Sequence, residues 1–173
     1  MNNKTKPIAL TTGEPAGIGP ELVVQLLQDP VNDRLCIFAD PDLLLERASL
    51  IGVSLAVKGD TLFGPGGTAQ IYPIELGGRS VAGDLDIKNA PYVIEMLTRA
   101  VDGCLNGEFA AMVTAPVQKS TLIEAGNNFV GHTEFLAQRA GVDTPVMMLA
   151  TGKLRVALVT IHLPLSEDPR AVT

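Results

Sequence analysis

The chain has 173 residues, of which 46% are hydrophobic and 18% are charged, so it can bury a core and its length fits about one domain. Its formal charge is −6 and it has no run of basic residues, which argues against nucleic acid and anionic membranes as partners. No apolar run approaches the ~20 residues of a membrane helix, and the amino-terminal residues lack the apolar core of a signal peptide. Cys36 and Cys104 lie in apolar segments without metal-type or redox-type spacing, which predicts core thiols in the reducing cytoplasm.

Apolar segments alternate with helix signals through the first half of the chain. Pro20 suits the first position of one helix, and Asp40 followed by Pro41 begins a second. The pattern predicts strands at 8–12, 34–39 and 54–57, helices at 20–28 and 41–50, a loop at 61–67 and extended structure at 70–76. Such alternation favours an α/β fold with a mixed, mostly parallel sheet and helices on its faces.

The glycine-rich segment 13–19 joins the first strand to the first helix, where α/β proteins bring bare backbone close to a ligand. The dinucleotide fingerprint G-x-G-x-x-G is not met, because Leu22 stands where the third glycine would be. The sequence also lacks the phosphate-loop pattern that ends in Gly-Lys-Ser/Thr. On these residues alone, a tight turn and a functional loop are equally open interpretations.

The second half begins with the clearest helix, 90–107, whose apolar residues fall on one stripe. A buried strand at 110–114 and a helix at 117–125 follow. Thr114 and Lys119 therefore lie where open α/β sheets bind ligands, although a single lysine is more often a solvated surface charge. The apolar segments 146–150 and 154–161, separated by three residues, predict an antiparallel hairpin.

The two histidines of the chain are the remaining candidate site residues. His132 and Thr133 stand at a loop-to-helix boundary, with Thr133 as the expected helix cap, Glu134 in the first turn and Gly141 at the end. The N–H groups at a helix start suit a phosphate or carboxylate, and the alternative is an ordinary capped helix beside an exposed histidine. His162 follows the last predicted strand, where an imidazole serves as a metal ligand or as a hydrogen-bonded structural group.

Five motifs carry a family resemblance that runs from about Pro7 to the last residue. The motifs are TGEPAGIGPE at 12–21, DGCLNGEFAA at 102–111, TAPVQK at 114–119, GHTEF at 131–135 and TIHLPL at 160–165. In this order they resemble the family of 4-hydroxythreonine-4-phosphate dehydrogenases. The first motif is also similar to the opening loop of the isocitrate and isopropylmalate dehydrogenase group, whose fold has two α/β lobes with the active site between them. The resemblance implies an isocitrate/isopropylmalate dehydrogenase-like α/β/α sandwich, truncated in this chain.

The resemblance also implies a reaction and its residues. The reaction is the NAD(P)-dependent oxidation of 4-phosphohydroxythreonine, with decarboxylation to 3-amino-2-oxopropyl phosphate, in vitamin B6 (pyridoxal phosphate) biosynthesis. Family members are homodimers, with a divalent metal such as zinc, magnesium or cobalt held by three histidines at the subunit boundary. By the same resemblance, His132 and Thr133 bind substrate and His162 is the first metal ligand. Residues 1–130 would form a first α/β lobe, and 131–173 the incomplete start of a second lobe with the dimer-forming region.

The chain departs from this family in length, since the family's members are much longer. With two histidines it cannot complete a three-histidine site, so we expect the isolated polypeptide to be inactive. Two other functions stay open. One is a related dehydrogenase of a phosphorylated sugar acid, such as 4-phosphoerythronate or phosphothreonate, and the other is a non-catalytic dimerisation or ligand-binding module.

Overall fold

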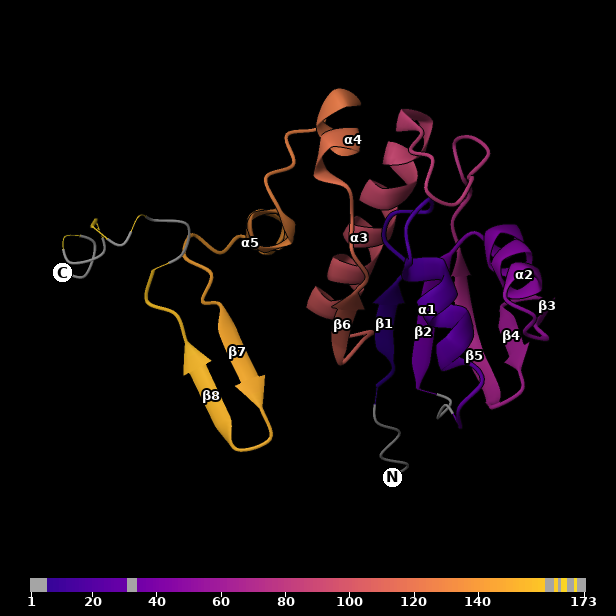
Figure 1. Cartoon of the computed structure of the whole chain (residues 1–173). Coiled ribbons are helices and arrows are strands. Elements are labelled where there is room, and N and C mark those ends of the chain that lie inside the picture. The colour runs from indigo at the N-terminus through magenta and orange to yellow at the C-terminus, as the bar shows by residue number, and fades with distance from the viewer. Residues whose placement is uncertain (1–5, 31–33, 161–163, 165, 168–169, 171–173) are drawn as a thin grey trace. The chain divides into compact units, whose positions relative to one another are not determined.

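The computed structural model describes residues 6–30, 34–160, 164, 166–167 and 170 (Figure 1). The chain divides into two compact units, one up to Phe129 and one from Val130 onward. Across the described residues, no helix has both the length and the apolar character needed to cross a bilayer.

A six-stranded mixed sheet forms the first unit, with strand order β3-β4-β5-β2-β1-β6. The strands are β1 (Ile8–Thr11), β2 (Leu35–Ala39), β3 (Ala56–Lys58), β4 (Thr61–Gly64), β5 (Gly67–Pro73) and β6 (Ala111–Thr114). β6, β1, β2 and β5 run parallel to one another, and β3 and β4 add antiparallel pairs at one side. The predicted mixed, mostly parallel sheet is therefore confirmed.

The loop predicted at 61–67 is wrong, because most of these residues form β4 and the tight turn into β5. Leu62 is fully buried and pairs with Ala69, while Gly64 pairs with Gly67 to close the turn. The glycines and the proline in this segment therefore mark a hairpin turn, and the buried side chain of Leu62 helps to anchor β4 in the sheet.

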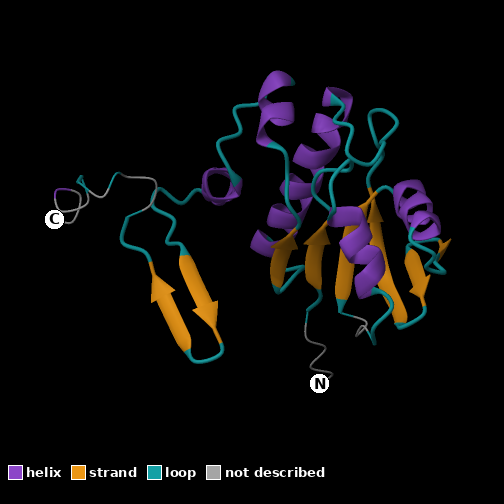
Figure 2. Ribbon diagram, viewed as in Figure 1, coloured by secondary structure: helices purple, strands orange, loops and turns teal. Residues whose placement is uncertain are grey.

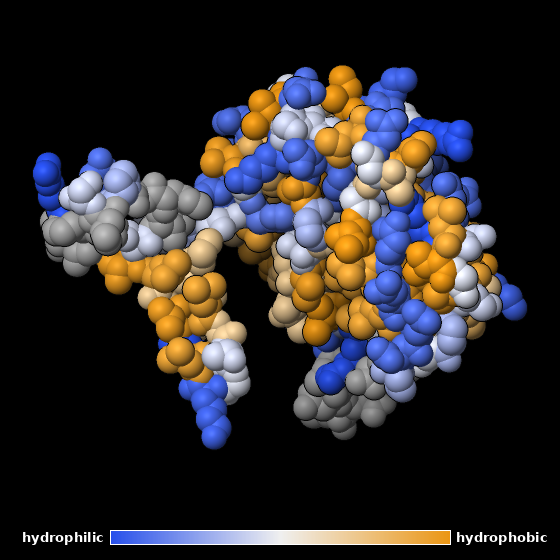
Figure 3. All heavy atoms as spheres, viewed as in Figure 1, coloured by the Kyte–Doolittle hydropathy of each residue, from blue (hydrophilic) through white to orange (hydrophobic). Residues whose placement is uncertain are grey.

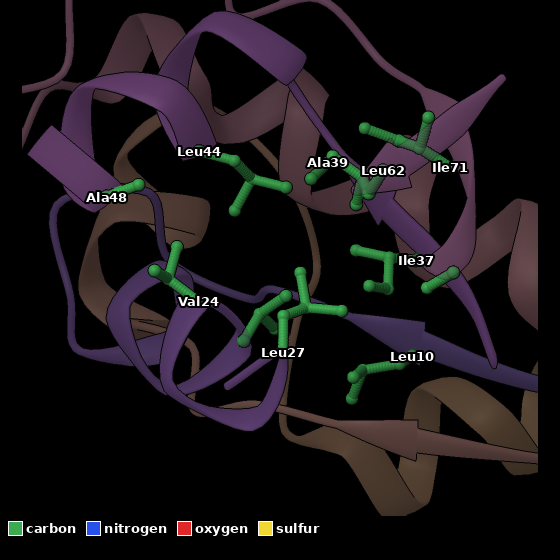
Figure 4. Close-up of a cluster of buried hydrophobic side chains, with 11 residues drawn as sticks. Leu10, Val24, Leu27, Ile37, Ala39, Leu44, Ala48, Leu62 and Ile71 are labelled. Atoms are coloured by element: carbon green, nitrogen blue, oxygen red, sulfur yellow. The ribbon is translucent and has the colours of Figure 1, made fainter. Parts of the chain in front are cut away.

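Helices cover both faces of the sheet (Figure 2). α1 (Gly19–Leu26) and α2 (Pro41–Leu50) pack on one face, and α3 (Ala90–Leu105) packs against β1, β2 and β6. The first face holds a buried apolar cluster to which α1, α2, β1, β2, β4 and β5 all contribute (Figure 4). Since side chains alternate along a strand, Leu10 and Ile37 enter this cluster, whereas Phe38 packs edge-on against Phe109.

Shorter elements complete the two units. The 3-10 helix η1 (Ile87–Asn89) leads into α3, and α4 (Lys119–Glu124) follows β6. The second unit contains α5 (His132–Ala140), β7 (Met148–Thr151) and β8 (Leu154–Ala157). β7 and β8 pair antiparallel, which confirms the predicted hairpin, although β8 ends before residues 158–160 that were expected to continue it.

Candidate functional site

The loop between β1 and α1 lies at the carboxyl ends of the parallel strands. Gly13 has a left-handed backbone, with φ of 69°. A Cβ atom on Gly13 would lie 2.3 Å from the carbonyl oxygen of Pro116, and one on Gly19 would lie 1.9 Å from that of Thr12. The glycines thus let this loop pack directly on neighbouring backbone, and the space beside them is filled by protein. At Gly13 and Gly19 the space on the side of a Cβ atom therefore holds backbone and leaves no room there for a cofactor phosphate.

A buried arginine fixes the same loop from the side of α2. The side chain of Arg47 is fully buried, and its Nη1 lies 2.7 Å from Oε1 of Glu21. Its Nη2 donates to the carbonyl oxygen of Pro15 at 3.0 Å and to the hydroxyl of Ser80 at 3.2 Å. Sequence reasoning missed this residue. The available signal was that Arg47, a charged residue, falls on the apolar face of the predicted helix, one turn after Leu44.

Burial raises the pKa of two acidic side chains near this loop, Glu14 and Tyr92. The side chain of Glu14 is 5% exposed, and burial raises the pKa of its carboxyl, although the backbone N–H of Ala16 donates to Oε1 at 3.2 Å and opposes that shift. The hydroxyl of Tyr92 lies 2.8 Å from that of Thr12, and burial raises the pKa of Tyr92 to about 12. The hydroxyl of Tyr92 therefore stays protonated at neutral pH and is available as a hydrogen-bond donor. Nothing in the local sequence pattern singled out Glu14.

Thr114 and Lys119, both weak candidates from the sequence, do not come together in a polar pocket. Thr114 is the last residue of β6 and lines an open groove of about 200 Å³ between α1 and β6. The other lining residues are apolar, and Lys119 is not among them. Lys119 is exposed and begins α4, a helix of six residues.

His132 and Thr133 occupy the first two positions of α5. The cap of this helix is Gly131, so the predicted cap role of Thr133 is wrong: the helix begins two residues earlier than predicted, and Thr133 already has helical backbone. Glu134 lies in the first turn as predicted, and Gly141 ends the helix with φ of 66°. His132 and Thr133 are both partly buried, at the helix end where N–H groups favour an anion.

The metal site implied by the family resemblance does not fit the residues present. His162 lies outside the described residues. Among residues 6–30 and 34–160, no three histidine, cysteine, aspartate or glutamate side chains gather in a way that could hold a metal ion. The whole chain has two histidines, one fewer than a three-histidine set requires.

Comparisons with known proteins place the chain in a family. The model of the family described as "Pyridoxal phosphate biosynthetic protein PdxA" matches residues 32–173. The chain is 48% identical to the 4-hydroxythreonine-4-phosphate dehydrogenase of Serratia proteamaculans and 47% identical to that of Yersinia enterocolitica. Each alignment of 178 residues covers 100% of this chain and 54% of the relative.

Solved structures agree with the sequence relatives. The crystal structure of a 4-hydroxythreonine-4-phosphate dehydrogenase from Burkholderia phymatum matches with a TM-score of 0.82 at 29% identity. That match covers 97% of this chain and 53% of the other. The chain thus spans about half the length of the relatives that it matches. Because the family match extends over most of the sequence, the chain belongs to the PdxA family of pyridoxal phosphate biosynthetic proteins.

Proposed function

We propose that this chain supplies the amino-terminal portion of an NAD(P)-dependent 4-hydroxythreonine-4-phosphate dehydrogenase. The observation that carries the proposal is 48% identity to such an enzyme over the whole chain. The complete enzyme would oxidise the secondary alcohol of 4-phosphohydroxythreonine, and the resulting β-keto acid would lose CO2 to give 3-amino-2-oxopropyl phosphate. We assign this reaction to cytoplasmic pyridoxal phosphate biosynthesis, a compartment consistent with the free thiols of Cys36 and Cys104.

His132 and Thr133 are the proposed substrate contacts. The helix dipole at the start of α5 favours an anion and disfavours an imidazolium, so a neutral His132 would donate one hydrogen bond to a carboxylate or phosphate oxygen. Thr133 does not occupy the cap position, and its hydroxyl would donate a second. Backbone N–H groups of the first helical turn would complete the anion site.

The divalent metal (zinc, magnesium or cobalt) would need more ligands than the two histidines of this sequence, and we propose that the nicotinamide cofactor also binds mainly to residues outside it. A catalytic zinc site typically uses about three protein ligands, and here only His162 is assigned to that role. The glycine loop is packed on protein backbone, which gives no support for a cofactor phosphate there. The isolated chain is therefore expected to be inactive, with the remaining ligands supplied by polypeptide outside this sequence.

We also propose that residues 131–173 contain the dimer-forming region. Leu149 lies opposite Val156 on the β7–β8 hairpin, and Leu154 follows on the same face. These three side chains are 60%, 40% and 60% exposed, and Figure 3 shows the apolar atoms along the hairpin. Because a lone two-stranded hairpin is marginally stable in water, burial of this face against a second copy would stabilise it.

The test is a turnover assay on two polypeptides. One is the 173-residue chain, and the other is this chain fused to the carboxyl-terminal residues of the Serratia proteamaculans relative that the alignment leaves uncovered. We expect reduced nicotinamide to form only with the fusion, and kcat/KM to be highest with 4-phosphohydroxythreonine. A preference for 4-phosphoerythronate or phosphothreonate would identify the related dehydrogenase. A folded fusion without turnover on any of them would favour the non-catalytic module.

A further inference from the structure

Glu14 is a buried carboxylate for which the described residues provide no cationic partner. Its side chain is 5% exposed, and the backbone N–H of Ala16 donates to Oε1 at 3.2 Å. Within the described part of the chain, Oε2 accepts no hydrogen bond and neither oxygen forms an ion pair. Burial raises the pKa of this carboxyl. Because a desolvated carboxylate is costly unless a cation offsets its charge, a glutamate at this position is a poor choice for stability alone.

Three hydrogen bonds from distant segments hold the turn that carries Glu14. Its own N–H donates to the carbonyl oxygen of Pro116 at 2.9 Å. The guanidinium of Arg47 donates to the carbonyl oxygen of Pro15 at 3.0 Å. The N–H of Gly83 donates to the next carbonyl oxygen of the turn at 2.8 Å. The carboxyl group is therefore held in a fixed place, as a side chain that recognises a ligand should be.

This turn lies where the strand order of the sheet reverses. From β1 the chain passes through α1 to β2 on one side, and after β5 it crosses back through α3 to place β6 on the other side of β1 (Figure 1). The loops that follow β1 and β6 meet through the hydrogen bond between Glu14 and Pro116. Open α/β sheets bind ligands outside the carboxyl ends of their strands at such a reversal. Glu14 therefore stands where this sheet is expected to meet a ligand.

A ligand with a positively charged group would offset the charge of Glu14. The proposed substrate, 4-phosphohydroxythreonine, is an amino acid with an α-ammonium group, whereas 4-phosphoerythronate has a hydroxyl group in its place. We infer that the carboxylate of Glu14 pairs with the ammonium group of the substrate and thereby selects the amino acid over the hydroxy acid. The hydroxy acid would leave the buried carboxylate without its cation. The inference rests on the proposed function, whose substrate it specifies.

The substrate preference of the fusion with the carboxyl-terminal part of the Serratia proteamaculans relative tests the inference. kcat/KM would be measured for 4-phosphohydroxythreonine and 4-phosphoerythronate in the parent fusion and in its Glu14→Gln variant, which removes the charge and keeps an oxygen for the Ala16 N–H. We expect the variant to lose at least about tenfold on the amino acid and less than about twofold on the hydroxy acid. The matched control is Glu46→Gln, at an exposed position of α2, which should change neither value.

Calorimetric titration of both compounds into the fusion repeats the comparison without turnover, and the same ratio of affinities is expected. Equal losses on both compounds, or no loss on the amino acid, would overturn the inference and leave the proposed function standing. A loss confined to the KM of the nicotinamide cofactor would do the same, since Glu14 would then face the cofactor. A parent fusion that neither binds nor oxidises 4-phosphohydroxythreonine would overturn both the inference and the proposed function.

Discussion

Replacement of the buried Arg47 by methionine provides the sharpest test of how the β1–α1 loop is held. The guanidinium has no solvent exposure, and it binds one carboxylate at 2.7 Å, one carbonyl oxygen at 3.0 Å and one hydroxyl at 3.2 Å. Arg47→Met leaves the carboxylate of Glu21, 19% exposed, without this charged partner. Breaking a buried ion pair from one side typically costs about 3–5 kcal/mol of unfolding free energy, which is large against a total of about 5–15 kcal/mol.

The assay is urea unfolding followed by far-UV circular dichroism, because the chain has no tryptophan for fluorescence. In a domain of this size, each kcal/mol of lost unfolding free energy lowers the melting temperature by about 2–4 °C. In a thermal scan, Arg47→Met should therefore lower the melting temperature by about 6–20 °C. The matched control is Arg99→Met, since Arg99 is 53% exposed and pairs with Glu95 at 3.4 Å, a contact that contributes at most about 1 kcal/mol.

A double-mutant cycle isolates the Arg47–Glu21 pair from the other contacts of the arginine. Adding Glu21→Gln to Arg47→Met should restore part of the loss, with a coupling energy of about 0.5–3 kcal/mol. The reasoning would be refuted if Arg47→Met destabilised the chain no more than Arg99→Met does, or if the two changes at the pair were simply additive.

Three further predictions follow from the described geometry. Burial raises the folded pKa of Glu14 above 4.5, so the free energy of unfolding falls as the pH rises through that pKa. Glu14→Gln should therefore have a higher melting temperature than the parent near about pH 7. Below about pH 4 the two melting temperatures should converge. Gly19→Ala puts a Cβ atom 1.9 Å from a backbone oxygen and should destabilise by at least about 3 kcal/mol in urea titrations, whereas Gly152→Ala, with no atom within 4 Å, should change stability by less than about 0.5 kcal/mol. Thr133→Val should likewise cost less than about 0.5 kcal/mol in thermal scans, because Thr133 does not cap α5, and a loss near 1 kcal/mol would restore the cap assignment.

The features that the sequence predicted well are those that depend on near neighbours along the chain. Asp40 caps α2 by accepting from the N–H groups of Asp42 at 2.9 Å and Leu43 at 3.2 Å, contacts that lie within three residues. Gly141 ends α5 for the same local reason, and it was also predicted. Alternating strands and helices correctly indicated a mostly parallel sheet, because parallel strands need crossover connections.

The features that the sequence missed depend on contacts between distant segments. The glycine-rich composition of residues 61–67 predicts a loop, but β4 forms there because Leu62 pairs with β5, a strand that composition alone does not reveal. The roles of Arg47 and Glu14 depend on partners and burial supplied by segments as far away as Ser80 and Pro116. At the candidate site, the sequence correctly put His132 at a helix start but placed the cap at the wrong residue, because helix ends are uncertain by one or two positions.

The measurement that tests the proposed function most directly is kcat/KM for 4-phosphohydroxythreonine, compared between the fusion and its His132→Ala variant. If His132 donates a hydrogen bond to a charged substrate oxygen at the start of α5, its loss should cost about 1–3 kcal/mol, a decrease of about five-fold to 150-fold. Cofactor affinity and melting temperature should stay close to those of the parent. A kcat/KM within about twofold of the parent, together with a lower melting temperature, would show that His132 is structural and would contradict the assignment of the substrate site.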